Sequence, residues 1–248
     1  MKIISPLLLV AVLIAAWWLA VAHSKTPYFP TPPQVVTGLI DLARNGTLLR
    51  HISASLMRVT IGYLAAVMIG IPLGVIMGWF AHVFFAVNPL VQLLRPISPI
   101  AWIPLAILWF GVGNLSPIFL IFLSSFFPLV VGAASGVHGV ERQFIRAAQN
   151  FGISGPRLLA QVVIPAALPQ IIVSMRLGLG IAWMVVVAAE MIAIDSGLGY
   201  LIIDSRNAGN RYDLVVAAMI MIGIIGLLLD AVMRRLNNLD EVRWRYAR

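Results

Sequence analysis

Long apolar runs alternate with shorter polar stretches along this 248-residue chain. Six runs have the length of membrane-spanning helices, which need about 20 apolar residues to cross the ~30 Å hydrocarbon core of a bilayer. They cover residues 3–22, 59–80, 84–111, 115–134, 171–194 and 214–232. The pattern predicts an all-α integral membrane protein with six transmembrane helices, folded as a single domain over residues 1–248.

The composition supports this class. Hydrophobic residues make up 61% of the chain and charged residues 10%, whereas soluble domains are about 45–50% apolar and about 25% charged. The net charge of +8 comes without a basic stripe interleaved with aromatic residues. We therefore expect membrane lipid, and no nucleic acid, as a partner. Cysteine is absent, which excludes disulfides and thiolate chemistry.

The first run has a second interpretation. Ala20-Val21-Ala22 resembles the cleavage site of a signal peptide. The apolar part of a signal peptide is usually only ~7–15 residues long, which is shorter than the run over residues 3–22. We therefore expect this run to be the first membrane span.

Residues 23–58 are mixed and are expected to lie outside the membrane. Prolines at 27, 30, 32 and 33 favour an extended strap at first. Apolar residues then recur at helical spacing, which predicts a short amphipathic helix at the membrane surface over residues 34–43. Residues 195–213 are expected to form a polar loop.

Small residues and prolines shape the second and third runs. Gly70, Gly74 and Gly78 form one stripe of a helix that another helix can approach closely. That second helix belongs either to this chain or to another copy of it. Prolines at 89, 96, 99 and 104 cannot all lie in a straight helix. The third run is therefore predicted to be broken and to face the interior of the bundle, because irregular backbone is not tolerated against lipid.

A polar interruption over residues 136–169 separates the fourth and fifth runs. Gly152 is expected to end a first short helix, because glycine readily adopts the left-handed conformation at a helix end. Pro156 suits the start of a second short helix. Pro165 and Pro169 are then expected to set the angle at which the chain returns to the membrane. The pattern predicts a helix-turn-helix that is presented to a partner in water.

The arginines favour one orientation. With both termini in the cytoplasm, Lys2, the polar interruption and the arginine-rich tail after residue 232 lie on the cytoplasmic side. Lysine and arginine are enriched on that side of membrane proteins. The strap over residues 23–58 and the loop over residues 195–213 then lie on the opposite side.

No constellation of residues indicates catalysis. The sequence contains no GxxxxGK[ST] phosphate loop, and its four histidines are scattered without paired carboxylates. The chain is therefore not expected to be an enzyme. Any energy source that the protein uses has to come from elsewhere.

The central interruption carries a motif. Arg146-Ala147-Ala148 is followed after three residues by Gly152, and nine residues later by Val162-Val163-Ile164-Pro165. This resembles the cytoplasmic loop of permease subunits in ATP-binding-cassette (ABC) importers, whose pattern is EAA, three residues, G, nine residues and IxLP. Arg146 replaces the usual Glu, Val162 the usual Ile and Ile164 the usual Leu. The motif identifies residues 136–169 as a coupling loop.

Further stretches resemble the nitrate/sulfonate/taurine/bicarbonate branch of these permeases. They are residues 95–104, 108–111, 178–190 and 197–200. The resemblance implies a homodimer of six-span subunits in a bacterial cytoplasmic (inner) membrane, importing a small solute such as nitrate, bicarbonate or a sulfonate like taurine. It also implies a dimer of cytoplasmic ATPases that binds ATP and Mg²⁺, and a soluble or lipid-anchored binding protein that delivers the solute. This chain itself needs no cofactor.

Polar residues at membrane depth are candidates for the solute path. An ionised side chain there costs about +2.5–3.5 kcal/mol on insertion scales. Arg95 lies in the broken third run with Ser98 and Trp102, and the three could attract an oxyanion. Alternatively, Arg95 reaches the cytoplasmic interface or pairs with a carboxylate. Ser124, near the centre of the fourth run, is a further candidate.

Glu190 is the remaining candidate. It lies fourteen positions after Arg176, or about 21 Å along one helix, so these two charges cannot pair within that helix. Structural partners on other helices are one interpretation, and a gate near Glu190 on the outer side is the other. A secondary transporter or channel for a small anion, working alone, is the alternative function. It would need intramembrane carboxylates or histidines for ion coupling, and Glu190 is the candidate.

Overall fold

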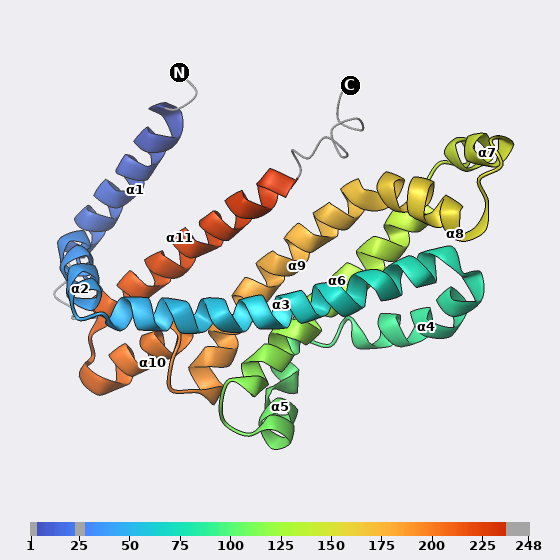
Figure 1. Cartoon of the computed structure of the whole chain (residues 1–248). Helices are drawn as coiled ribbons and strands as arrows, with labels where there is room; N and C mark the ends of the chain where they lie inside the picture. The colour runs from blue at the N-terminus through green and yellow to red at the C-terminus, as the bar shows by residue number, and fades with distance from the viewer. Residues whose placement is uncertain (1–3, 23–27, 237–248) are drawn as a thin grey trace.

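The computed structural model describes residues 4–22 and 28–236. Within them all regular structure is helical, as predicted (Figure 1). The helices are α1 (Ile4–Ala22), α2 (Pro32–Arg44), α3 (Thr47–Trp79), α4 (Ala81–Leu94), the 3-10 turn η1 (Pro99–Trp102), α5 (Ile103–Phe110), α6 (Leu115–His138), α7 (Arg142–Asn150), α8 (Gly155–Leu158), the π-helical turn η2 (Leu159–Val163), α9 (Ile164–Ala193), α10 (Leu198–Gly209) and α11 (Tyr212–Leu236). Residue 3 of the first predicted span, residues 23–27 of the strap and the tail after residue 236 lie outside the described residues.

The apolar runs coincide with helices. Four described segments are long and apolar enough to cross a membrane: Thr47–Trp79, Leu115–His138, Gly155–Ile192 and Tyr212–Arg235. The apolar helix over Leu8–Ala22 is shorter than these four. A crossing by the first run therefore stays a prediction.

The third run is broken, as its prolines predict. Ala81–Leu94 and Pro99–Phe110 together are apolar enough to make a fifth span, but they are bent by 86° relative to each other. Pro99 and Pro104 each lie in the first turn of a new helical piece, where a missing N–H is tolerated. The bend therefore falls on residues 95–98, between α4 and η1.

Glycines set the central packing of α3 against α6. A Cβ atom at Gly62 would lie 2.7 Å from the Ile118 carbonyl oxygen, and one at Gly74 would lie 2.4 Å from that of Val130. Successive glycines of α3 therefore meet successive turns of α6, and the two helices run parallel. The predicted glycine stripe packs within this chain.

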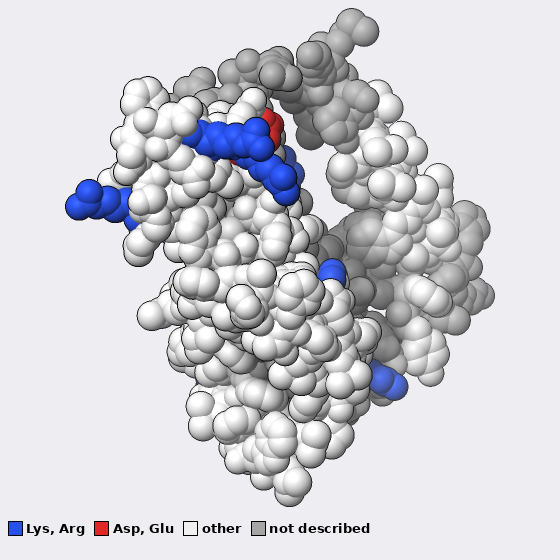
Figure 2. All heavy atoms as spheres, turned by 90° about the vertical axis from the view of Figure 1, so that its right-hand side faces the viewer, with Lys and Arg blue, Asp and Glu red and all other residues white. Residues whose placement is uncertain are grey.

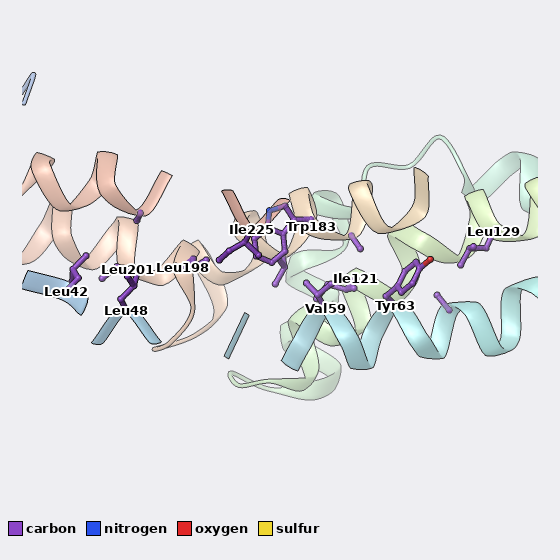
Figure 3. Packing of buried hydrophobic residues seen from close by; sticks show 14 residues of the cluster. Leu42, Leu48, Val59, Tyr63, Ile121, Leu129, Trp183, Leu198, Leu201 and Ile225 are labelled. Carbon is purple, nitrogen blue, oxygen red and sulfur yellow. The ribbon is translucent and has the colours of Figure 1, made fainter. Parts of the chain in front are cut away.

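Helix α9 runs antiparallel to α6 and α11. Gly132 on α6 faces Ser174. The hydroxyl of Ser125, earlier on α6, donates a 3.3 Å hydrogen bond to the carbonyl of Gly178, which comes later on α9. The Trp183 indole donates a 3.0 Å hydrogen bond to the Ile222 carbonyl of α11. The largest hydrophobic cluster joins these helices with α3 and α10 (Figure 3).

These directions give the bundle two ends. The α7 end holds α7, α8, the C-terminal ends of α3, α6 and α11, and the start of α9. The α10 end holds α2, α10, the starts of α3, α6 and α11, and the end of α9 (Figure 1). The predicted surface helix is present as α2, with Val35, Gly38 and Leu42 buried.

Two sequence expectations at the α10 end need correction. Helix α3 starts at Thr47, whereas the second run begins at residue 59. The expected polar loop over residues 195–213 contains the helix α10. In both places the sequence is polar enough to look like a loop, but contacts within the fold allow polar residues to lie on a helix. Hydropathy alone does not show such contacts.

Candidate functional site: the α7–α8 loop and a buried ion pair

The helix-turn-helix predicted after the fourth run is present as α7 and α8. Helix α7 ends at Asn150, and Gly152 has the left-handed φ of +78°. The Gly152 N–H donates to the Gln149 carbonyl at 2.9 Å, and the Ile153 N–H to the Ala148 carbonyl at 3.0 Å. These bonds close the helix end as a glycine C-cap does. The predicted role of Gly152 as a helix stop is confirmed.

Helix α7 has one packed face and one free face. Ala148 is buried and belongs to a cluster with Leu158, Val163 of η2 and Val137 of α6. Ala147 and Arg146 are exposed on α7, and Phe151 at the turn is 86% exposed. The loop is therefore anchored to α6 and α9 by one face, and it presents small and aromatic side chains to the surroundings with the other.

The return to the bundle begins earlier than the prolines predict. Residues Gly155–Ile192 form one helical segment that includes α8, η2 and α9. Pro165 lies in the first turn of α9, directly after the π-helical turn, and Pro169 lies inside α9. A π turn alters the hydrogen-bonding register locally, so the helix continues past both prolines. The helical segment therefore passes through both prolines without a break, and their role in setting the angle of return to the membrane stays a prediction.

A buried ion pair connects α3 to α9 at the α10 end. Arg58 Nη1 lies 2.6 Å from Glu190 Oε1, and the two side chains are 1% and 0% exposed. Arg58 also donates to the Asn114 side chain at 2.8 Å and to the Ser196 carbonyl at 2.9 Å. The guanidinium thus joins α3, the start of α6 and the segment between α9 and α10.

The second oxygen of Glu190 is also occupied. The Ser55 hydroxyl donates to Oε2 at 2.8 Å, and the Gly199 N–H donates to it at 3.0 Å. Gly197 has a φ of +107°, and a Cβ there would lie 2.2 Å from the Glu190 carboxyl carbon. The backbone at residues 197–199 therefore wraps closely around the carboxylate. Within the described residues, no buried side-chain nitrogen or oxygen lacks a hydrogen-bond partner.

An open depression lies beside this pair. Its volume is about 450 Å³. Its lining includes Arg50, Ser53, Met57, Arg58, Asn114 and Asp195. Arg50 and Asp195 are exposed there, so the depression is polar and carries charges of both signs.

The other candidates for the solute path lie in two places. Arg95 and Ser98 are exposed in the bend between α4 and η1, and Trp102 is half-buried at the end of η1. Trp102 stands 6.4 Å from Trp109, between ring centroids. Ser124 is buried, and its hydroxyl donates to the Ile121 carbonyl of its own helix at 2.8 Å. The structure therefore keeps Arg95, Ser98 and Trp102 in one irregular segment, with Ser124 and Glu190 elsewhere in the bundle.

Arg176 and Glu190 each have a partner on another helix. This agrees with the interpretation that the two charges have structural partners elsewhere in the bundle. Arg176 pairs with Asp230 of α11, and Glu190 pairs with Arg58. Sequence reasoning missed Arg58. Its signal was available, because His51, Ser55 and Arg58 are spaced to share one face of a helix, and all three are buried.

Comparisons with known proteins relate this architecture to transport. Residues 48–245 match the family described as "Binding-protein-dependent transport system inner membrane component". The chain is 40% identical over 237 residues to the taurine transport system permease protein TauC of Escherichia coli, across 92% of this chain and 85% of TauC. It is 33% identical over 247 residues to the nitrate import permease protein NrtB of Synechocystis, across 96% of this chain and 89% of NrtB.

A solved structure shares the fold. A chain of the MetNI methionine ABC transporter, in an inward-facing conformation, matches with a TM-score of 0.66 at 18% identity, over 78% of this chain and 98% of that one. The family match spans most of the chain, including α3 to α11, and the sequence relatives extend over nearly all of it. The chain therefore belongs to the inner-membrane permease components of binding-protein-dependent ABC transport systems, and it is a transport subunit rather than an enzyme.

Proposed function

We propose that this chain is the six-span permease subunit of an ATP-driven importer for a small oxyanion. Two copies form the translocation path between them, a dimer of cytoplasmic ATPases binds ATP and Mg²⁺, and a soluble or lipid-anchored binding protein delivers the solute. The chain itself holds no cofactor in this arrangement.

The two-faced α7–α8 loop carries the proposal. Its buried face ties it to α6 and α9, so a force on α7 is transmitted to the bundle. Its free face offers Ala147, which leaves room for a groove to close around it, and the exposed ring of Phe151. Ala148 and Gly152 maintain the shape of the loop, and Pro165 lies in the first turn of α9, which receives the force. Arg146 occupies the rim of the free face, where the family pattern has Glu.

Charge supports a cytoplasmic α7 end. Exposed arginines at this end outnumber acidic residues: Arg142, Arg146, Arg157, Arg234 and Arg235 accompany Glu141 and the half-buried Asp230. Figure 2 shows arginine side chains gathered over the α7–α8 corner with little acidic surface beside them. At the α10 end, Arg44, Arg50, Arg206 and Arg211 are matched by Asp41, Asp195, Asp204 and Asp213. An excess of arginine marks the cytoplasmic side. Because six spans return the chain to the side on which it started, both termini are then cytoplasmic in this proposal.

The bend and the relatives both support an oxyanion as the solute. TauC and NrtB are named for taurine and nitrate, both of which carry an oxyanion group. Arg95 offers an exposed guanidinium beside the Ser98 hydroxyl and near the Trp102 indole, where a second copy would complete the path. Ser124 and Glu190 belong to the walls of that path in this proposal, since both are buried and bonded within the chain.

The coupling role is tested by Gly152→Val. A branched side chain is strained at a φ of +78°, although the space around the site is empty. We expect the variant to insert and fold but to lose ATP-driven uptake in proteoliposomes that contain the ATPase and the binding protein. Gly46→Val is the matched control, because Gly46 has a φ of +69° and empty surroundings at the α10 end. Normal uptake by Gly152→Val would refute the coupling role.

The alternative of a transporter or channel that works alone has a separate test. Proteoliposomes that contain this chain without the ATPase are given an inward gradient of nitrate, bicarbonate or taurine. The proposal predicts no uptake until the ATPase, the binding protein and ATP are present. Uptake from the gradient alone would favour the alternative.

A further inference from the structure

A crevice lies between α9 and α11, away from the α7–α8 loop and the Arg58–Glu190 pair. Its volume is about 140 Å³. A Cβ atom at Gly180 would have no neighbour within 4 Å, and Gly226 lies under the Trp183 indole. Gly180 therefore leaves a gap in the packing of the helices, and Gly226 lets the Trp183 indole approach α11 closely. Its apolar wall consists of Leu179, Gly180, Trp183, Gly226, Leu229 and Met233.

One end of the crevice is charged. Asp230 accepts a 3.0 Å hydrogen bond from Arg176 Nη2 and a 2.9 Å bond from Arg234 Nε. One carboxylate therefore holds two guanidinium groups, and the cluster keeps a net positive charge. Arg235 follows directly at the end of α11 and adds to it.

The cluster lies close to the C-terminal end of α11. Asp230 comes six residues before the end of that helix at Leu236, or about 9 Å along its axis. Arg176 and Asp230 pair with each other and still expose 39% and 31% of their side chains. The exposed parts of these charged groups therefore leave room for a further polar group from outside the chain.

We propose that the crevice is a binding site for an anionic phospholipid of the leaflet at the α7 end. The lipid phosphate lies against Arg176 and Arg234, and the upper part of an acyl chain fills the gap beside Gly180 and Gly226. Basic pockets between membrane helices suit such headgroups. A zwitterionic lipid would bring a second positive charge to a cluster that is already positive, so the site favours an anionic lipid. The site does not depend on which solute is transported.

Native mass spectrometry of the purified full-length protein tests the site. The protein is titrated with phosphatidylglycerol or with phosphatidylcholine of identical acyl chains, and the retained lipid is counted. We expect phosphatidylglycerol to be retained preferentially. Gly180→Leu should abolish the preference by filling the gap, whereas Ala86→Leu, which adds bulk on the exposed side of α4, should leave it unchanged.

The charged end has its own matched pair of variants. Arg234→Gln should weaken phosphatidylglycerol retention by about fivefold, the effect of one cation near a lipid surface. Arg211→Gln is the control, because Arg211 also pairs with an aspartate of α11, at the opposite end of that helix. It should have no effect on retention.

Three outcomes would overturn the proposal. Equal retention of the two lipids by the unmodified protein would show that the site does not select charge. A preference that survives both Gly180→Leu and Arg234→Gln would place the lipid elsewhere. A Gly180→Leu variant that separates two-copy assemblies while lipid retention is unchanged would assign the crevice to a contact between copies. The comparison of the two lipids on the unmodified protein stands even if a variant fails to fold.

Discussion

Arg58 and Glu190 form an ion pair of 2.6 Å between α3 and α9, shielded almost completely from the surroundings. Every neighbour that completes their hydrogen bonding comes from the α10 end of the bundle. The pair therefore fixes how α3, α6, α9 and the start of α10 are arranged there. Removing one partner is far more harmful than removing both, because a single buried charge remains unbalanced.

Arg58→Met is expected to lower the free energy of unfolding by about 3–5 kcal/mol. The loss should appear as a lower unfolding temperature of the purified protein in detergent, measured by tryptophan fluorescence. The double variant Arg58→Met/Glu190→Met should recover part of it. Arg211→Met is the control, because its pair with Asp213 is half exposed and such pairs contribute about 0–1 kcal/mol. Equal stability of Arg58→Met and Arg211→Met would contradict the role of the pair.

Gly197→Ala is expected to displace the Glu190 carboxylate. The new Cβ would lie 2.2 Å from the carboxyl carbon, at a φ of +107°. Strain alone costs about 1–3 kcal/mol, and loss of carboxylate contacts adds to it. Gly113→Ala has a positive φ but empty surroundings, so it reports the backbone effect alone. The unfolding temperature of Gly197→Ala should be clearly lower than that of Gly113→Ala. If the two variants unfold at the same temperature, the close wrapping of residues 197–199 around the carboxylate does not contribute to stability.

Gly74→Ala is expected to push α3 away from α6. Its Cβ would lie 2.4 Å from the Val130 carbonyl oxygen and 2.7 Å from Ala133 Cβ, and overpacking of this kind costs about 1–3 kcal/mol. Gly223→Ala adds the same methyl group to α11 where no atom lies within 4 Å. The yield of monodisperse protein after solubilisation should fall for Gly74→Ala and stay unchanged for Gly223→Ala. Unchanged yield for both would argue against close packing of α3 on α6.

Ala147→Trp and Ala148→Trp should fail in different ways. Ala147 faces outward, so its variant should fold with an unchanged unfolding temperature but no longer co-purify with the ATPase. Ala148 is buried against Leu158 and Val163, so its variant should lose stability before any partner is added. ATPase binding by a well-folded Ala147→Trp variant would place the contact on another face.

Arg95→Gln is expected to slow import of an anionic solute while leaving the fold intact, because Arg95 is exposed and its charge supports no buried contact. Initial uptake rates at several solute concentrations are the measurement. Asn88→Gln is the control. Asn88 lies on α4, about two helical turns before the bend, so this variant reports any general disturbance of the α4–α5 segment. Unchanged uptake by Arg95→Gln would remove Arg95 from the solute path.

Local chemistry made much of this architecture predictable. Four prolines predicted the bend between α4 and α5, and Gly152 predicted the end of α7, because each residue acts through its own backbone. The stripe of Gly70, Gly74 and Gly78 predicted a close helix contact, but only the fold identified α6 as the partner. The spacing of residues identifies which face of a helix makes a close contact, but it does not identify the helix that packs against that face.

The misses share a different cause. Arg58 and His51 made the start of α3 look like part of a water-exposed strap, because hydropathy treats each charge alone. Their cost is offset by residues far away in sequence, including Glu190, Asn114 and the backbone of Gly197. Likewise, no pattern in the sequence indicated that helix would extend back from Pro165 through the π turn to Gly155.

The continuous helix from Gly155 to Ile192 has a mechanical consequence. At about 1.5 Å per residue, its 38 residues connect α8 at one end of the bundle to Glu190 at the other. If the chain works as proposed, a displacement of α8 is passed along this helix toward the Arg58–Glu190 pair. A change at one end of the bundle is then felt at the opposite end without any separate connecting element.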